Sequence, residues 1–268
     1  MKLYHREFGS GFPLIILHGL YGSSDNWFSY GRELSNQYHV FLVDQRNHGQ
    51  SPHSNDFNFR LMRDDLSEFF EDRKIGKGIL IGHSMGGKTA MYFAATFPEK
   101  VEKLVIVDIA PKSYKALPES ISQVKGHKQI IAALSGLELS RYHTREEIDK
   151  ALSSDISHPR VRQFLLKNLK RDNSGGFSWT LNLRSIAENF DQIFDVCDDD
   201  LAVLAGSAPS MPVLFVKGEL SNYILKSDYE KIRGIFPQSE IKVIPGAGHW
   251  LHAEKPESFM KILTDFLH

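Results

Sequence analysis

The chain has 268 residues, of which 41% are hydrophobic and 24% charged, and its formal net charge is -1. These values are typical of a globular protein with a large core, and the balanced charge gives no electrostatic basis for binding nucleic acid or an anionic membrane. Cys197 is the only cysteine, so no disulfide can form within the chain. The first apolar run, Phe12 to Leu17, is too short for a signal sequence or a membrane span, so we expect a cytoplasmic protein without membrane insertion.

Strands and helices are expected to alternate along most of the chain. Several apolar runs are hydrophobic on successive residues, as is typical of strands covered on both faces. The expected strands are Pro13–His18, Tyr38–Asp44, Gly78–His83, Val101–Asp108, Met211–Lys217 and Ser239–Pro245. The expected helices are Asp25–Asn36, Phe57–Arg73, Met85–Phe97, Leu225–Phe236 and Pro256–Leu267. This order predicts an α/β fold with a mainly parallel central sheet and flanking helices.

The alternation stops between about Lys112 and Pro209, where helical patterns follow one another. Phe177 and Trp179 begin a short alternating stretch, which predicts one extended piece there. A connection of this length without structure is improbable, so we interpret it as a helical lid. The expected organisation is a core made of residues 1–111 and 210–268, with the lid, residues 112–209, inserted into it.

A serine enclosed by glycines gives the strongest functional signal. Residues 78–87 read GILIGHSMGG, which predicts a strand, a sharp turn at Ser84 and the start of a helix. Such a turn raises the serine hydroxyl above the sheet edge and leaves the next amide, that of Met85, free to face a developing negative charge. Ser84 is therefore the candidate nucleophile.

The same residues also satisfy a phosphate-binding pattern. Gly82 to Thr89 fits G-x-x-x-x-G-K-[ST], and Asp108 ends a strand in the way that a magnesium-binding aspartate does. Both patterns place a loop between a strand and a helix, so local structure does not separate them. The hydrolase interpretation also predicts an early oxyanion donor and a late histidine, whereas nucleotide binding explains neither and stays the remote alternative.

Both of these additional features are present. The strand at residues 14–17 ends in His-Gly, which directs the Leu20 amide into the cleft beside that of Met85 as an oxyanion hole. His249 lies in the glycine turn GAGHW directly after the last strand, where a catalytic base can reach Ser84.

With these motifs the chain resembles the α/β-hydrolase superfamily over essentially its whole length. The segments DQRNHGQSPHS at residues 44–54, GHSMGGK at 82–88 and VDIAP at 107–111 are similar to the small bacterial acyl esterases and their mitochondrial abhydrolase-11 relatives. The resemblance implies activity on acyl esters and on acyl-CoA thioesters.

The chain departs from the superfamily at the triad acid. Most members have an aspartate in a G-x-x-D turn after the strand that corresponds to Met211–Lys217, but here Ser221 stands at that position. Asp108 follows the strand next to the nucleophile, and the resembling subgroup uses this earlier acid. Asp108 is the preferred acid and Glu219 is its rival, because triads are defined by geometry and not by chain order.

The sequence thus predicts a serine carboxylesterase or thioesterase that acts on small acyl substrates and needs no metal or organic cofactor. A receptor that retains the triad and a cofactor-free perhydrolase remain alternatives. Three further groups are assigned structural roles: His18 and His83 as backbone partners, Arg46, Asn47 and His48 as loop anchors, and Lys88 as a packing or ion-pair residue that could steer an anionic substrate.

Overall fold

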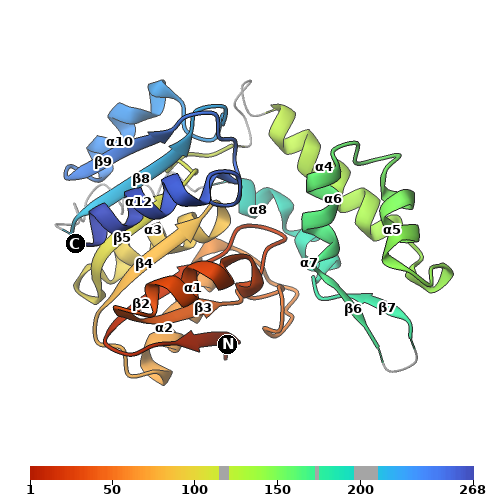
Figure 1. Cartoon of the computed structure of the whole chain (residues 1–268), viewed down its shortest axis with the longest axis horizontal. Coiled ribbons are helices and arrows are strands. Elements are labelled where there is room, and N and C mark those ends of the chain that lie inside the picture. The colour runs from red at the N-terminus through yellow and green to blue at the C-terminus, as the bar shows by residue number, and fades with distance from the viewer. Residues whose placement is uncertain (115–120, 173–174, 196–210) are drawn as a thin grey trace.

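The computed structural model describes residues 1–114, 121–172, 175–195 and 211–268, and its centre is a seven-stranded sheet in the order β1-β3-β2-β4-β5-β8-β9 (Figure 1). Only β1 runs antiparallel to its neighbour, and the other six strands are parallel. The strands are β1 His5–Phe8, β2 Phe12–Leu17, β3 Tyr38–Val43, β4 Gly78–His83, β5 Val101–Val107, β8 Val213–Gly218 and β9 Ser239–Ile244. The mainly parallel sheet of the predicted fold class is confirmed.

Strand β1 is the only element of this sheet that the sequence did not predict. This strand, HREF, is short, three of its four residues are polar, and all but the exposed Glu7 are half-buried at the sheet edge. An edge strand of this kind is stabilised by its backbone pairing with β3, which an apolar pattern cannot reveal.

Helices cover both faces of the sheet, and two apolar clusters fill the space between. Helices α1 and α12 pack with the residues of one face, whereas α2, α3 and α10 pack with those of the other. The helices of this part of the chain are α1 Phe28–Leu34, α2 Phe59–Asp72, α3 Met85–Thr96, α10 Tyr229–Ile235, α11 Leu251–Glu254 and α12 Pro256–Leu267, with 3-10 turns at Ser24–Trp27, Pro98–Lys100 and Lys226–Asp228. This arrangement leaves the carboxyl ends of the strands at one edge of the sheet.

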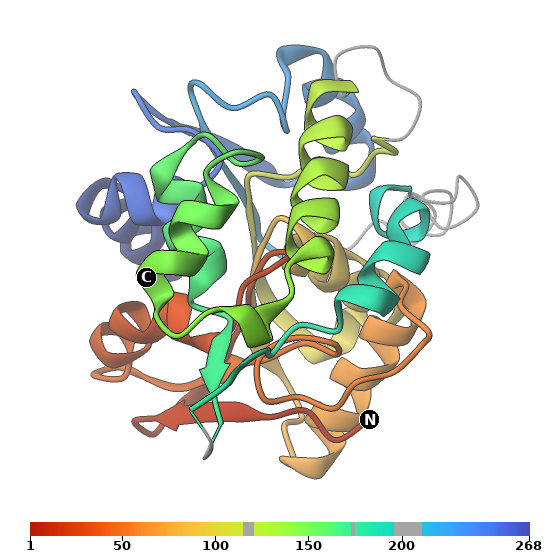
Figure 2. The same cartoon turned by 90° about the vertical axis from the view of Figure 1, so that its right-hand side faces the viewer.

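Between the neighbouring strands β5 and β8, the described residues 112–114, 121–172 and 175–195 are largely helical; we call them the inserted segment. Figure 2 shows its helices in front of the strand ends. Its elements are α4 Ile121–Gly136, a 3-10 turn at Leu139–Arg141, α5 Arg145–Leu152, α6 Pro159–Leu166, β6 Leu169–Arg171, β7 Phe177–Trp179, α7 Leu183–Glu188 and α8 Phe190–Phe194.

The helical character expected for the inserted segment agrees with these elements, and the extended piece expected at Phe177 is strand β7. Leu169, which fits the helical spacing of the residues before it, instead begins β6 and pairs with Trp179. Cys197 lies outside the described residues. None of the described helices is long and apolar enough to cross a membrane.

Candidate active site

Ser84 occupies a strained turn between β4 and α3. Its backbone φ and ψ are 52° and -115°, a conformation that residues other than glycine rarely adopt. The turn is packed against backbone: a Cβ on Gly86 would lie 2.5 Å from the carbonyl oxygen of Leu17, and one on Gly82 would meet Gly86. The glycines around the serine are therefore required by close backbone contacts, and the turn places the Ser84 hydroxyl at the strand ends.

The structure brings together the serine, the histidine and the aspartate that the sequence singled out. Ser84 Oγ lies 3.1 Å from His249 Nε2, and His249 Nδ1 lies 2.8 Å from Asp108 Oδ2. Asp108 is fully buried, whereas the His249 side chain retains 19% exposure. The three side chains follow β4, β5 and β9, so the parallel sheet itself assembles the group.

The environment of Asp108 separates the two candidate acids. The carboxylate accepts hydrogen bonds from the backbone N–H of Gly218 at 3.1 Å and from the hydroxyl of Ser221. Glu219 Oε2 instead accepts from the backbone N–H of Gly246 at 2.8 Å, within an exposed turn. Ser221 therefore supports the carboxylate of Asp108 from the position at which most superfamily members carry the acid.

The proposed oxyanion donors lie beside Ser84. Leu20 and Met85 both line the space next to the serine. Within the described part of the chain, neither backbone N–H donates a hydrogen bond. Both amides therefore remain able to bind an oxygen that develops negative charge.

The two histidines expected to bind backbone do so. His18 donates from Nδ1 to the Gly19 carbonyl at 2.9 Å and accepts at Nε2 from the backbone N–H of Gln45 at 3.0 Å. His83 Nε2 donates to the carbonyl of His249 at 3.0 Å. Burial lowers the pKa of His18 to about 4 and that of His83 well below its usual value. Burial thus favours the neutral form of both rings, which support the turns around Ser84 and His249 through backbone hydrogen bonds.

The loop after β3 is fixed by the residues predicted to fix it. Arg46 forms a bidentate ion pair with buried Asp65, with its Nη2 at 2.8 Å from Oδ1. Asn47 reaches the inserted segment, because its carbonyl accepts from the N–H of Asn182 at 3.0 Å. His48 Nε2 accepts from the N–H of Tyr21 at 3.2 Å, which holds the chain beside Leu20.

The phosphate-loop alternative does not fit this geometry. Helix α3 begins directly after Ser84, and a Cβ on Gly87 would meet the Ile109 side chain at 2.6 Å, so no open cradle exists there. Thr89 is 1% exposed and its hydroxyl donates to Gln45 Oε1 at 2.9 Å. A threonine that binds a magnesium ion would need to be accessible from the loop.

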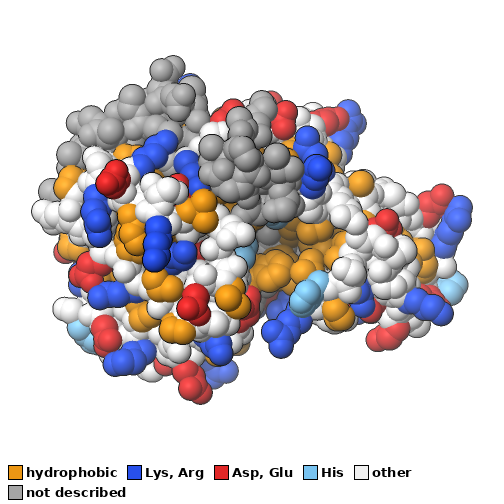
Figure 3. Space-filling view, turned by 90° about the horizontal axis from the view of Figure 1, so that it is seen from above, with side chains coloured by type: hydrophobic (Ala, Val, Ile, Leu, Met, Phe, Trp, Pro, Cys, Tyr) orange, Lys and Arg blue, Asp and Glu red, His pale blue; other side chains and the backbone are white. Residues whose placement is uncertain are grey.

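A cavity of about 250 Å³ opens beside Ser84 and His249; we call it the main cavity. Apolar side chains gather where the inserted segment meets the body of the molecule (Figure 3). Besides Ser84 and His249, the lining includes Leu20, Ile130, Val161, Phe164, Leu165 and Trp250.

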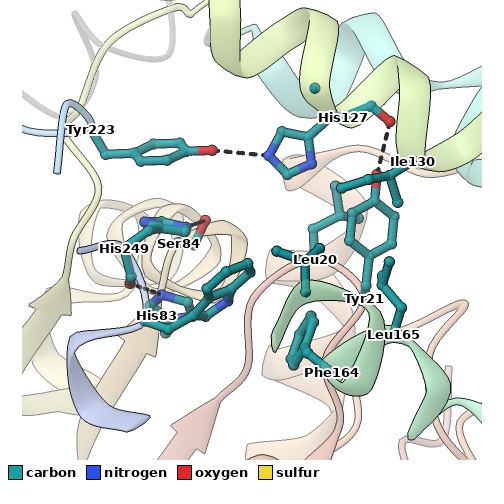
Figure 4. A pocket seen from close by; sticks show the side chains of 13 residues that line it. Leu20, Tyr21, His83, Ser84, His127, Ile130, Phe164, Leu165, Tyr223 and His249 are labelled. Carbon is teal, nitrogen blue, oxygen red and sulfur yellow. Dashed lines mark hydrogen bonds between the residues drawn. The ribbon is translucent and has the colours of Figure 1, made fainter. Parts of the chain in front are cut away.

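Two residues that line the main cavity, His127 and Tyr223, were not predicted from the sequence as part of the site. Tyr223 stacks on His249 with ring centroids 3.8 Å apart, and its hydroxyl lies 2.9 Å from His127 Nε2 on α4 (Figure 4). Neither residue belongs to a local motif, and they meet only because α4 lies against the loop that follows β8. No signal in the sequence identifies this pair.

Comparisons with known proteins agree with this architecture. The chain is 38% identical over 262 residues to the sn-1-specific diacylglycerol lipase ABHD11 of Mus musculus, covering 95% of this chain and 80% of that protein. It is 32% identical to the esterase YbfF of Escherichia coli, covering 95% and 92% of the two chains. The solved structure of a marine microorganism esterase has a TM-score of 0.91 and 45% identity, and covers 99% of both chains.

The relatives are named as esterases and lipases, so the chain is a hydrolase enzyme. The family model for the alpha/beta hydrolase fold matches residues 13–256, and the chain belongs to the α/β-hydrolase family.

Proposed function

We propose that this enzyme is a serine carboxylesterase and thioesterase that works through an acyl-enzyme. The observation that carries the proposal is the continuous contact from Ser84 Oγ to His249 Nε2, at 3.1 Å, and from His249 Nδ1 to Asp108 Oδ2, at 2.8 Å. Such a chain of contacts activates a serine that is otherwise a weak nucleophile.

Each residue then has one role in the reaction. Ser84 attacks the acyl carbonyl while His249 takes its proton and passes it to the leaving group. Asp108 holds the Nδ1 proton of His249 and stabilises the imidazolium. The Leu20 and Met85 amides bind the oxyanion, and water activated by His249 then releases the acid.

The main cavity favours a substrate with an apolar portion. Its volume of about 250 Å³ lies beside Ser84, and side chains of α6 such as Val161, Phe164 and Leu165 form one wall. Because α6 belongs to the inserted segment, this segment acts as a lid that limits the size of the groups that reach Ser84. The proposed division into a core, residues 1–111 and 210–268, and a lid rests on this placement.

The test is the variant Ser84→Ala. We expect it to fold normally and to lose hydrolysis of p-nitrophenyl butanoate, since it removes only the nucleophilic oxygen. A fluorophosphonate probe is expected to label the wild type at Ser84 and to leave the variant unlabelled. Near-normal turnover by the variant, or labelling at another residue, would contradict the assignment.

Repeated turnover separates an esterase from a receptor that retains the triad. A receptor would stall after about one equivalent of released p-nitrophenol, whereas an esterase continues. Matched oxygen esters and thioesters of one acyl group then measure the preference between the two substrate classes. Addition of hydrogen peroxide with acetate tests the perhydrolase alternative, through the formation of peracetate.

A further inference from the structure

Lys88 is a buried lysine that the proposed reaction does not use. It lies on α3 one turn after Ser84, and its backbone N–H bonds to the Ser84 carbonyl at 3.1 Å. The residue is only 2% exposed, and its Nζ has no hydrogen-bond partner among the described residues. Long helical side chains lean toward the helix N-terminus, so this ammonium is directed back toward the serine.

The surroundings of Lys88 do not supply the missing carboxylate contact. Its Nζ lies 5.3 Å from the ring centre of Phe59 and 4.8 Å from that of Tyr114, which are cation–π contacts. The next cation, Lys112, is already paired with Asp228 at 2.8 Å. The negative charge of Asp195 acts on Lys88 electrostatically and opposes the lowering of its pKa by burial. A buried ammonium without a hydrogen-bond acceptor is costly to the fold, so a purely structural role for it is poorly supported.

A second, smaller cavity lies between Lys88 and Ser84; we call it the side cavity. Its volume is about 20 Å³, and such a space holds roughly one water-sized group. Its lining includes Met85, Lys88, Ile109, Tyr114, Ile193 and Phe194. The main and side cavities share Leu20, Ser84, His127 and Tyr223, so the two spaces meet at the nucleophile. An ester bound at Ser84 can therefore place one arm in each.

We propose that the side cavity receives only the carboxylate end of a short acyl chain, that Lys88 binds this carboxylate, and that the leaving group lies in the main cavity. This inference rests on the proposed function of Ser84. The side cavity is small, apolar and closed by one cation, which fits a compact acid better than a long alkyl chain. The main cavity is larger and apolar, which fits an extended alcohol or thiol portion.

The reaction itself is unchanged by the added carboxylate. The bond from Ser84 Oγ to the acyl carbon forms while the bond from that carbon to the leaving oxygen or sulfur breaks, and His249 transfers the serine proton to the leaving atom. Water then cleaves the acyl-enzyme, which releases a dicarboxylic acid. Lys88 makes no bond in either step and acts as a specificity determinant. A neutral acyl chain of equal length would leave the buried ammonium without its partner, and sites of this kind reject such analogues strongly.

The experiment compares matched pairs of phenyl esters that differ only at the end of the acyl chain. The pairs are the phenyl monoesters of malonate, succinate and glutarate against phenyl propanoate, butanoate and pentanoate. For at least one pair, the wild type is expected to show a kcat/KM at least ten times higher for the carboxylate member. In Lys88→Met this preference disappears, so that the ratio of kcat/KM between the carboxylate member and the neutral member falls to about one.

Lys100→Met is the matched control. Lys100 also makes a cation–π contact, at 5.0 Å from the Phe97 ring centre, but it lies beyond the opposite end of α3 and lines neither cavity. We expect Lys100→Met to keep the wild-type preference. As a measurement that needs no variant, free succinate is expected to inhibit the wild type competitively at concentrations at which butanoate does not.

The outcomes distinguish this inference from the proposed function. Equal wild-type kcat/KM values for both members of every pair would overturn the role of Lys88. An equal loss of kcat/KM for both members in Lys88→Met would overturn it as well. In either case, phenyl butanoate hydrolysis that disappears in Ser84→Ala would leave the proposed function intact. Absence of any ester hydrolysis together with absence of fluorophosphonate labelling would contradict both proposals.

Discussion

Asp108 has no freedom to turn away from His249, because every part of its carboxylate is engaged. Oδ2 binds His249 and Ser221, while Oδ1 accepts from the Gly218 amide. Its φ of 51° further fixes the backbone at the end of β5. The site therefore relies on a carboxylate that is already oriented before a substrate arrives.

Replacing this carboxylate is expected to disable the proposed base. Asp108→Asn keeps the size of the side chain but favours the wrong imidazole tautomer of His249. We therefore expect kcat to fall by about 10⁴-fold, as it does in serine proteases that lose the triad aspartate. The matched control is Glu219→Gln, which retains an oxygen for the Gly246 amide and is expected to cost at most a few-fold. The check is kcat of both variants at one pH. A large loss in Glu219→Gln with a near-normal Asp108→Asn would transfer the role to Glu219.

Lys88 is also expected to make the free energy of unfolding depend on pH. Burial lowers its pKa from 10.5 to about 7 in the folded protein. Between these pH values the unfolded chain holds more protons than the folded one, so this residue makes the wild type more stable as pH rises. The destabilisation that comes from burying the protonated Lys88 is complete below pH 7 and disappears near pH 10.5.

Lys88→Met is therefore expected to be more stable than the wild type at pH 6, and this advantage should shrink by about 1 kcal/mol per pH unit above pH 7. Urea denaturation of both proteins between pH 6 and pH 9 measures the difference. An advantage that stays constant over this range would show that Lys88 does not titrate there.

At the scale of elements, the Tyr223–His127 contact joins the loop after β8 to helix α4 of the inserted segment. The ring of Tyr223 lies over His249, with 21° between their planes, and its hydroxyl bonds His127 Nε2. A second contact runs from the Tyr21 hydroxyl to the His127 carbonyl at 3.4 Å. One side chain thus positions the imidazole of His249, the proposed base, and also holds α4 beside it.

These two roles of Tyr223 are separable by substitution. Tyr223→Phe keeps the ring over His249 and removes the hydrogen bond, whose net value is typically about 1 kcal/mol, so we expect a few-fold change in kcat and faster amide exchange in α4. Tyr223→Ala also removes the stacked ring, and a loss in kcat of at least ten-fold is expected. Equal kcat values in the two variants would contradict the role of the Tyr223 ring in positioning His249.

The strands and helices of the core could be predicted because their apolar patterns repeat locally. The strand predicted at Gly78–His83 is β4 without any shift, and the helix predicted from Met85 is α3, because the glycines around Ser84 define both ends. Strand β1 was not predictable, since its pairing depends on β3, which lies over thirty positions later in the chain. In the same way, the choice between Asp108 and Glu219 depends on hydrogen bonds among loops that are distant in sequence.

At the scale of the whole molecule, the described residues form two apolar clusters, one on each face of the sheet, and of these two only one reaches the main cavity. The cluster under α1 and α12 contains Leu263, while the other contains Leu165 and continues into the inserted segment. Stability depends on both clusters, but substrate selection should depend on one. The sequence shows which residues are apolar, whereas it does not show to which face each helix belongs, because that follows from the crossover connections.

Two leucines test this division, since both are fully buried and only Leu165 lines the main cavity. Leu263→Ala and Leu165→Ala are each expected to reduce the free energy of unfolding by about 2–5 kcal/mol through lost contacts and a new cavity. Leu263→Ala should keep kcat/KM for every ester within about two-fold of the wild type at a temperature at which it is folded, because α12 lies behind the sheet. Leu165→Ala enlarges the substrate space, and its kcat/KM should rise for bulky leaving groups relative to small ones. A shift in ester preference in Leu263→Ala equal to that in Leu165→Ala would mean that the far face of the sheet also shapes the site.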